Sequence, residues 1–428
     1  MTLDLLIRDA SVVLTCDDND HVVSDVSIGI RDGLIAHIGE ALPADQVLAA
    51  DGHLVLPGLV NLHTHLAMAL LRGIAENVDL QGFLSLVWAE EARIMDKTGV
   101  ELGTRLGAVE ALLAGTTTAL DMYFHPHAAH RGAVAVGLRH VTGPIFFDFP
   151  GPDGLEWSER LSYARSWPQL VAAIGGPQVP LALMPHSPLT VGPTRLGEVA
   201  ELARELGAMV HTHASENRAE NEQTDLKFGA RPIPLLHNAG LVDPGTVIAH
   251  GVHLDDADIA SLAGGRSSVA HCPGSNLKLA SGAADVVKYR AAGLRVGIGT
   301  DGCASSNDLD MFAAMRLTAN LARLVRDDPA AISANEVLRM ATIDGAQALG
   351  LGDRIGTVEI GKEADLVLLD LDAPHLMPLR DPATAVVYSA GRSDVRHVIV
   401  AGELVVRDRM PTRVELAEVL AQARQVIA

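Results

Sequence analysis

The stretch LVLPGLVNLHTH (residues 54–65) decides the fold, because an apolar run leads directly into His63 and His65. Side chains alternate faces along a β-strand with a period of two, so the imidazoles of His63 and His65 point to the same side. Two imidazoles on one side can bind one metal ion. A His-x-His pair is frequent by chance, so the metal interpretation depends on what the rest of the chain adds.

The composition restricts the class of protein. Of 428 residues, 48% are apolar and only 3% aromatic, which is typical of parallel strands covered by helices. The net charge of −20 repels phosphate backbones and anionic lipids, so we expect no binding of nucleic acid or membrane. The scattered cysteines Cys16, Cys272 and Cys303 predict no disulfide framework. The first residues do not resemble a signal peptide, and we expect a cytoplasmic protein.

Both ends of the chain are predicted to be β-structure. Residues 1–56 alternate short β-branched runs with turns, which predicts a small antiparallel unit. Residues 353–412 show the same pattern, with an Ala401-Gly402 turn between two apolar runs. We expect these two pieces to pair into one small β-sandwich domain, followed by a C-terminal helix over 413–428.

The middle of the chain, residues 57–352, alternates predicted strands with amphipathic helices. Strands are expected over residues 59–63, 117–124, 139–142 with 145–149, 181–185, 209–213, 247–250, 268–271 and 294–300. Helices are expected between them, for example over 99–114, 197–206 and 285–292. Eight strands in roughly 295 residues fit an α/β fold of the (β/α)8 TIM-barrel type. A doubly wound open sheet is the competing interpretation.

Titratable residues follow almost every predicted barrel strand. They are His63, His65, His186, His213, Glu216, His250, His271 and Asp301. The carboxyl ends of barrel strands carry the chemistry, and buried His and Asp side chains need partners. Three imidazoles and one carboxylate around a divalent ion form a catalytic site of the zinc type. Glu216 would then move protons, although a helix N-terminal acid at Ser215-Glu216 is the alternative interpretation.

The segments that follow these strands resemble one known family. They are residues 57–65 (PGLVNLHTH), 71–73 (LRG), 121–124 (DMYF), 185–188 (PHSP), His213 with Glu216, 249–250 (AH), 271–279 (HCPGSNLKL) and 299–302 (GTDG). The chain is similar to the amidohydrolase superfamily, and within it to deaminases of 5′-methylthioadenosine and S-adenosylhomocysteine. The resemblance covers the whole predicted barrel.

The resemblance implies a site with assigned roles. One divalent metal ion per subunit, Zn²⁺ or alternatively Fe²⁺ or Mn²⁺, would be bound by His63, His65, His213 and Asp301. Asp301 would accept a proton from water, His250 would orient the water or the oxyanion, and Glu216 would protonate the ring nitrogen beside the attacked carbon. Glu91 would contact the ribose hydroxyls and His186 the purine.

The resemblance also implies a substrate class. An adenine nucleoside (5′-methylthioadenosine, adenosine or S-adenosylhomocysteine) would be converted to the inosine analogue and ammonia by a homo-oligomer, a dimer or a tetramer. Some relatives carry an arginine for the homocysteine carboxylate, but Gly143-Pro144-Ile145 offers none, which disfavours S-adenosylhomocysteine. The alternative is a deaminase or chlorohydrolase of guanine, a pterin or an s-triazine; Glu91 favours a ribose over a bare ring.

Other polar residues receive structural interpretations. His211 shares a strand face with His213, and we expect it to be buried and hydrogen bonded. Cys303 is expected to fill space, and His271 to lie near the metal without binding it. We expect exposed loop histidines at positions 125, 127 and 130.

Overall fold

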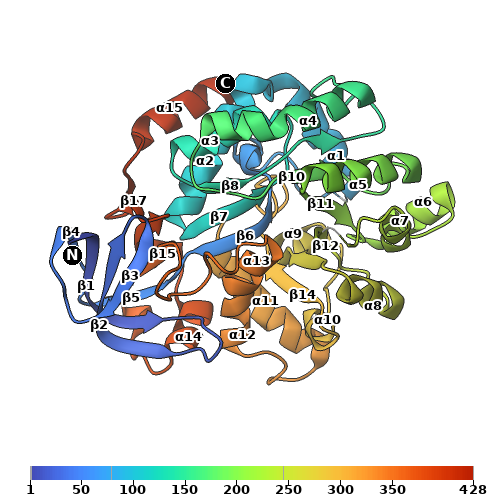
Figure 1. Cartoon of the computed structure of the whole chain (residues 1–428). Coiled ribbons are helices and arrows are strands. Elements are labelled where there is room, and N and C mark those ends of the chain that lie inside the picture. Colours follow the sequence, from blue (N-terminus) through green and yellow to red (C-terminus); the bar gives the residue numbers. More distant parts are fainter. Residues whose placement is uncertain (1, 79, 244, 428) are drawn as a thin grey trace.

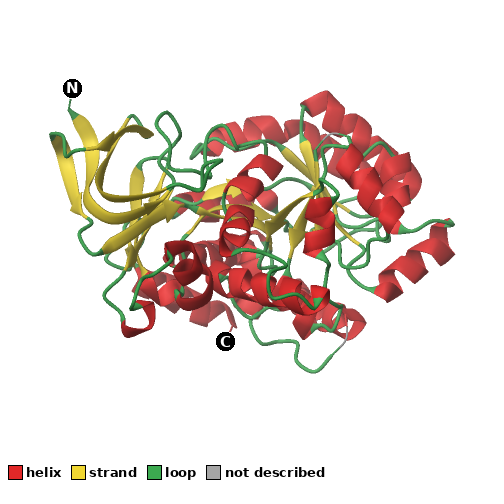
Figure 2. Ribbon diagram, turned by 90° about the horizontal axis from the view of Figure 1, so that it is seen from below, coloured by secondary structure: helices red, strands yellow, loops and turns green. Residues whose placement is uncertain are grey.

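The computed structural model describes residues 2–78, 80–243 and 245–427. A barrel of parallel strands lies beside a curved sheet that is built from both ends of the chain (Figures 1 and 2). Met1 and Ala428, the outermost residues of the predicted end segments, lie outside the described residues. The predicted α/β class, with a TIM-type barrel and a small β-domain, is confirmed.

The barrel strands occupy nearly the predicted ranges. They are β6 (Leu59–Thr64), β7 (Thr116–Asp121), β8 (Arg139–Val141), β9 (Ile145–Phe146), β10 (Ala182–Pro185), β11 (Met209–Ala214), β12 (Thr246–His250), β13 (Ser268–His271) and β14 (Arg295–Ile298). β6 to β8 form one parallel sheet and β9 to β14 another. After β14, the Asp301 amide donates to the His63 carbonyl at 3.0 Å, which closes the barrel.

The third barrel strand is interrupted, in agreement with the predicted pieces 139–142 and 145–149, but β9 ends at Phe146, before the predicted end at 149. β8 pairs with β7 before the break, and β9 pairs with β10 after it. A Cβ atom on Gly143 would lie 1.8 Å from the Ala182 carbonyl oxygen, so only glycine fits where β10 passes. Pro144 has no N–H to donate to a neighbouring strand. These two residues therefore divide the strand.

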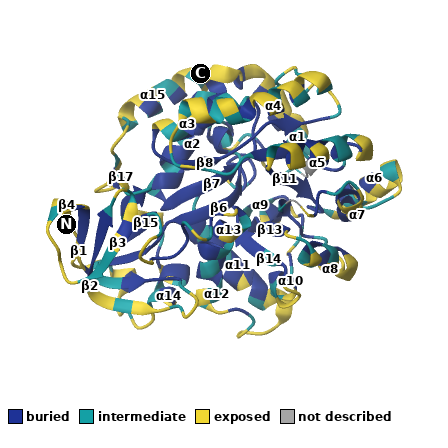
Figure 3. Cartoon of the chain, viewed as in Figure 1, coloured by how far each residue is buried: buried dark blue, intermediate teal, exposed yellow. Residues whose placement is uncertain are grey.

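Helices cover the outside of the barrel, and their outer faces are exposed (Figure 3). The helices of the described chain are α1 (Leu80–Ile94), α2 (Lys97–Leu113), α3 (Pro126–Ala135), α4 (Trp157–Ile174), α5 (Pro193–Leu206), α6 (Arg218–Phe228), α7 (Pro232–Asn238), α8 (Asp256–Gly264), α9 (Pro273–Lys278), α10 (Val286–Ala291), α11 (Met311–Arg326), α12 (Ala334–Met340), α13 (Ile343–Ala348), α14 (Pro382–Thr384) and α15 (Leu416–Ile427). The helices predicted over 99–114, 197–206 and 285–292 are confirmed as α2, α5 and α10. In the described part of the chain, no helix is long and apolar enough to cross a membrane.

Barrel side chains alternate between two hydrophobic clusters. Leu59, Ala119 and Leu183 pack with residues of the covering helices. Val60 and Leu62 belong to a second cluster with other strand residues. This alternation is expected where each strand has one face toward the helices and one toward the barrel interior. The side chains at the carboxyl ends are therefore left to line an opening.

The small domain is one nine-stranded mixed sheet. Its strands are β1 (Leu3–Leu14), β2 (Val22–Arg31), β3 (Leu34–Gly39), β4 (Ala44–Ala49), β5 (His53–Pro57), β15 (Leu366–Asp370), β16 (Val395–Val400), β17 (Glu403–Arg407) and β18 (Met410–Pro411). The unit at 1–56 is not purely antiparallel, which corrects the prediction. The strand β1 has 12 residues. Along one edge it pairs in parallel first with β4 and then with β5. The boundaries 1–56 with 353–412, 57–352 and 413–428 stay predictions.

Candidate metal centre and active site

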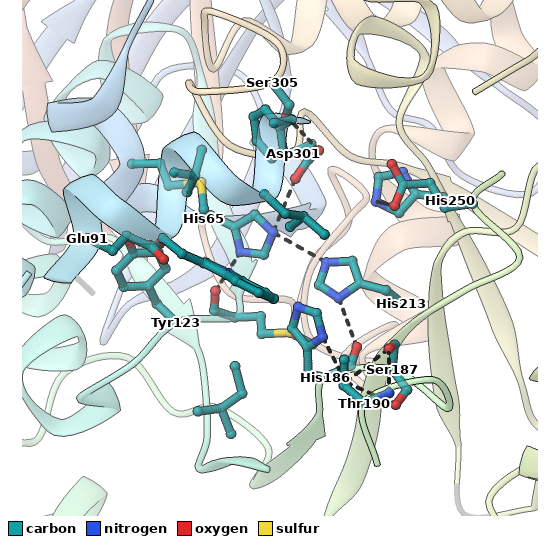
Figure 4. A pocket seen from close by; sticks show the side chains of 18 of the residues that line it. His65, Glu91, Tyr123, His186, Ser187, Thr190, His213, His250, Asp301 and Ser305 are labelled. Atoms are coloured by element: carbon teal, nitrogen blue, oxygen red, sulfur yellow. Dashed lines mark hydrogen bonds and ion pairs between the residues drawn. The ribbon is translucent and has the colours of Figure 1, made fainter. Parts of the chain in front are cut away.

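Four side chains meet at the carboxyl end of the barrel. His63 is the next-to-last residue of β6, and His65 directly follows this strand. His213 lies on β11, and Asp301 lies in the loop after β14. Ring nitrogens of the three histidines lie within 4.8 Å of one another. Asp301 Oδ1 lies 3.3 Å from His63 Nε2 and 3.2 Å from His65 Nε2. Figure 4 shows the side chains of His65, His213 and Asp301 pointing toward one another.

The loop after β14 turns one oxygen of Asp301 toward the histidines. Asp301 has a φ of +60°, in the left-handed region. Its amide is held by the His63 carbonyl at 3.0 Å, and its Oδ2 accepts a hydrogen bond from Ser305 Oγ at 2.7 Å. Oδ1 is therefore left to face the three rings.

Backbone carbonyls fix the rings of His65 and His213. His65 Nδ1 lies 2.6 Å from the Met122 carbonyl oxygen, and His213 Nδ1 lies 2.9 Å from that of His186. A carbonyl oxygen only accepts, so each Nδ1 carries the hydrogen and each Nε2 presents a lone pair. The two Nε2 atoms lie 3.3 Å apart, with lone pairs directed at the same space.

His63 is oriented by His211, a contact that the sequence analysis did not identify. His211 Nδ1 donates to the Val247 carbonyl at 2.9 Å. His211 Nε2 must therefore accept the hydrogen of His63 Nδ1, which lies 2.8 Å away. His63 Nε2 is left with a lone pair, and it is buried without a hydrogen bond. His211 is buried as predicted; the signal for its role was the second His-x-His pair, at 211 and 213.

These donors fit a divalent cation. Three imidazole lone pairs and a carboxylate oxygen facing one another repel each other unless a positive charge lies between them. Tetrahedral zinc sites with nitrogen and oxygen ligands use these donor types. Hydrogen bonds that hold the second nitrogen of each ligating histidine are the usual companion of such a site. His63, His65, His213 and Asp301 would thus hold the ion.

The pKa values show how strongly burial acts on the cluster. Burial lowers the pKa of His63 to about 4 and the pKa of His213 well below its ordinary value. Burial also acts against a charge on His65, but Asp301 overcomes it and raises the pKa of His65 to about 9. A proton on His65 and a cation use the same lone pair, so metal affinity should fall as the pH falls.

Glu216 and His250 lie beside the four side chains. His250 Nε2 is 3.9 Å from Glu216 Oε2, and His250 Nδ1 is 2.9 Å from Asn276 Oδ1. Burial raises the pKa of Glu216, so this carboxyl group holds a proton more readily than an exposed one. The N-cap of α6 is Asn217, so Glu216 precedes the helix and lines the pocket. This placement does not support the helix N-terminal interpretation.

A pocket opens above this cluster, with polar groups on two sides (Figure 4). On one side, Glu91 of α1 is 2% exposed and accepts a hydrogen bond from Tyr123 Oη at 2.6 Å. Its Oε2 has no hydrogen-bond partner within the described chain. On another side, the His186 ring stacks on Phe147 with centroids 4.8 Å apart. Both predicted substrate contacts therefore lie in the same pocket as the cluster.

The other histidines and the cysteine that were considered from the sequence are not among the four proposed metal ligands. His130 is 1% exposed on α3, with Nδ1 3.1 Å from His140 Nδ1, so the expectation of an exposed loop residue was wrong. The reason is that Pro126 starts α3, which turns His130 toward β8. His125 and His127 are partly buried, and His127 also lies on α3, so the expectation of exposed loop residues was wrong for them as well. Cys303 is buried within the hydrophobic core, as expected. His271 is buried, and neither ring nitrogen has a partner in the described residues.

The chain is similar in sequence and in fold to known proteins. The model of the amidohydrolase family matches residues 54–405. A 5-methylthioadenosine/S-adenosylhomocysteine deaminase of Syntrophobacter fumaroxidans is 39% identical, over 99% of this chain and 97% of the relative. The structure of an adenosine deaminase from Xanthomonas campestris with bound zinc has a TM-score of 0.95 at 35% identity, covering 99% of this chain and 98% of its own.

A second solved structure has a different activity. It is an atrazine chlorohydrolase from Arthrobacter aurescens TC1, complexed with zinc, with a TM-score of 0.90 at 25% identity. The match covers 99% of this chain and 100% of the chlorohydrolase chain. Proteins of similar structure therefore act on different substrates. The family model nevertheless matches most of this sequence. The protein belongs to the amidohydrolase family.

Proposed function

We propose that the protein is a metal-dependent hydrolytic deaminase that converts an adenine nucleoside to its inosine analogue and ammonia. The observation that carries the proposal is the shared pocket. Glu216 lies beside the ligand cluster, which is formed by His63, His65, His213 and Asp301, and Glu91 offers a free carboxylate oxygen in the same pocket. The first group suits proton transfer and the second suits a hydroxyl-bearing substrate. The deaminase names of the relatives support the same substrate class.

The ion is proposed to be one Zn²⁺ per subunit, with Fe²⁺ and Mn²⁺ as alternatives. A bound divalent metal lowers the pKa of water and so supplies hydroxide near neutral pH. Zinc in two similar structures supports this choice. His63, His65, His213 and Asp301 are the proposed ligands.

The chain's own residues carry the proton steps. We assign to Asp301 the first proton of the attacking water, because its carboxylate faces the cluster. Glu216 then passes a proton to the ring nitrogen beside the attacked carbon, and its burial favours the protonated form that this step requires. His250, held by Asn276, orients the oxygen that is added. The proton that Asp301 accepted then passes to the amino nitrogen, and the carbon–nitrogen bond breaks to release ammonia. Glu216 takes back the proton of the added hydroxyl, which leaves a carbonyl.

Two residues of the pocket wall are proposed to hold the nucleoside. The free Oε2 of Glu91 would accept a ribose hydroxyl, with Tyr123 holding the other oxygen. Burial lowers the pKa of His186 to about 3, so its neutral ring would contact the purine. A neutral imidazole suits a neutral heterocycle, since no charge is left without a partner.

The 5′ substituent is proposed to be uncharged. Among the described residues that line the pocket, none is Lys or Arg, and many are apolar, including Phe83, Leu84 and Val87. Arg160 donates to the Ile145 carbonyl but is already paired with Asp153. The carboxylate of S-adenosylhomocysteine would find no cation here. Methylthioadenosine and adenosine are therefore the preferred substrates.

Ammonia release from a substrate panel tests the proposal. We expect methylthioadenosine and adenosine to be turned over with a kcat/KM above those of S-adenosylhomocysteine, guanine, a pterin and atrazine. Activity on guanine, a pterin or atrazine with none on a nucleoside would establish the second candidate, a hydrolase of another aminated or chlorinated heterocycle. The similar atrazine chlorohydrolase is the observation that keeps this candidate.

Assembly and location are further proposals. A homo-oligomer, dimer or tetramer, is expected, and light scattering on the purified protein measures it directly. A cytoplasmic location fits a small-molecule substrate and can be tested by cell fractionation.

A further inference from the structure

A second buried carboxyl group lies next to Glu216 in the pocket wall. Glu220 is in the first turn of α6, is 8% exposed, and lines the same pocket as Glu216. None of the roles described above uses it. Charged groups are buried at a cost unless they are paired, so the position of Glu220 calls for a physical reason.

Hydrogen bonds hold Glu220 in one orientation. Its Oε2 accepts the backbone N–H of Glu216 at 2.7 Å. Its own N–H donates to Asn217 Oδ1 at 2.8 Å, and its carbonyl accepts from Thr224 Oγ1 at 2.7 Å. The carboxyl group is thus fixed on the turn that carries Glu216.

This turn has an unfavourable backbone conformation. Ser215 has a φ of +54°, in the left-handed region that residues with a side chain rarely adopt. The His253 amide holds the Ser215 carbonyl at 3.0 Å, while Glu220 holds the next amide. The peptide unit between Ser215 and Glu216 thus has one hydrogen bond to its carbonyl and one from its amide. These two bonds keep the turn in place and set where the Glu216 side chain points.

Capping of α6 does not account for the whole carboxyl group. Its Oε1 is buried and has no hydrogen-bond partner in the described chain. Burial raises the pKa of Glu220 to about 7, and the nearby Glu216 carboxyl acts in the same direction. A cap on the surface would have neither feature, so an acid at this position is unfavourable for stability.

We infer that Glu220 is a positioning residue, which directs the Glu216 carboxyl group at the substrate by binding the Glu216 backbone amide. The inference rests on the proposed deaminase function, because Glu216 is the proton carrier of that reaction. A displacement of about 1 Å in a catalytic group can lower turnover by about 100-fold.

The test compares three variants of the metal-loaded protein. Glu220→Ala should lower kcat by about 100-fold, with KM changed less than about threefold and metal content unchanged. Glu220→Gln keeps an acceptor oxygen for the Glu216 amide and should recover kcat to within about tenfold of the parent. Glu222→Gln changes an exposed acid of the same helix and is the matched control, with unchanged kcat. If Glu220→Ala does not fold, Glu220→Asp shortens the reach and should show the same loss of kcat.

Amide hydrogen exchange of residues 214–217 separates this inference from the proposed function. The segment should exchange at least about tenfold faster in Glu220→Ala than in the parent and in Glu220→Gln, whether or not any nucleoside is deaminated. A parent protein without deaminase activity but with this exchange pattern contradicts the function and leaves the hydrogen bond supported. Unchanged exchange, or unchanged kcat in Glu220→Ala, overturns the positioning role.

Discussion

Two buried polar clusters in this protein are built on opposite principles. In the first, the ligand cluster, His63, His65, His213 and Asp301 direct lone pairs and a negative charge at one another. In the second, the junction cluster, Arg139 of β8 binds Asp365 through Nε at 3.2 Å and Nη2 at 2.9 Å, Glu363 at 2.6 Å and the Gln178 carbonyl at 2.9 Å.

The difference lies in what each cluster lacks. The junction cluster is complete: each guanidinium nitrogen has a partner, and Asp365 Oδ1 also accepts the Ala401 amide at 2.7 Å. It joins the barrel to the small sheet. The ligand cluster leaves His63 Nε2 without a hydrogen bond, and the proposed metal ion would supply its partner. Removing one residue should thus affect metal and activity in the first cluster, and stability in the second.

The largest effect is expected from His213→Ala. Loss of one ligand nitrogen should release the metal ion and lower kcat/KM on the order of 10⁴-fold. Elemental analysis and ammonia release measure the two effects. His125→Ala, a histidine outside the cluster, is the control and should keep its metal. Stoichiometric zinc in His213→Ala would overturn this ligand assignment.

Glu216→Gln should separate proton transfer from metal binding. Metal content should stay at one ion per chain, because Glu216 is not a proposed ligand. Turnover should fall by about 10³-fold, since an amide cannot carry the proton. Rates near those of the parent protein would refute the role of Glu216.

The junction cluster should respond in the opposite way. Arg139→Ala leaves the buried carboxyl group of Asp365 without its cation, and the free energy of unfolding should fall by about 3 kcal/mol or more. Urea unfolding measures this, and metal content per folded chain should be unchanged. Arg165→Ala, whose ion pair with Glu205 is half exposed, should cost less than about 1 kcal/mol. Equal losses in the two variants would contradict the comparison.

The smallest effect concerns pH. Burial raises the pKa of Glu91 from 4.5 to about 7, so between these values the folded state keeps a proton that the unfolded state has lost. The free energy of unfolding should therefore fall as the pH rises through this window, by up to about 1.4 kcal/mol per pH unit. Glu91→Gln removes this contribution, so it should gain about 2 kcal/mol relative to the parent between pH 5 and pH 8. The exposed Glu222→Gln should show no such gain.

Much of the fold followed from the sequence because strand ends in a barrel share one edge. That rule placed His63, His213 and Asp301 on the same edge without any long-range information. The start of β9 at residue 145 was predicted correctly, but its end was placed at 149, because the extent of its pairing with β10 decides that it stops at Phe146. Pairing of β1 with both β4 and β5 depends on contacts distant in sequence.

The supporting residues of the site were harder to predict. Glu220 has the pattern of an ordinary acid in the first turn of a helix, and only the fold shows that its oxygen reaches the Glu216 amide. His211 was expected in the core. Its hydrogen bond to His63 could not be predicted, because it depends on how close β6 and β11 lie to each other. His130 was misassigned because nothing local shows that α3 faces it inward. Such contacts are set by packing between elements, which periodicity does not report.

Anomalous diffraction at the zinc edge, on crystals of the metal-loaded protein, tests the central claim most directly. We predict one zinc ion per chain, with bonds of about 2.0–2.2 Å to Nε2 of His63, His65 and His213 and to a carboxylate oxygen of Asp301. A zinc ion elsewhere, a second ion in the pocket, or an ion that leaves any of these four residues unbound would contradict the account.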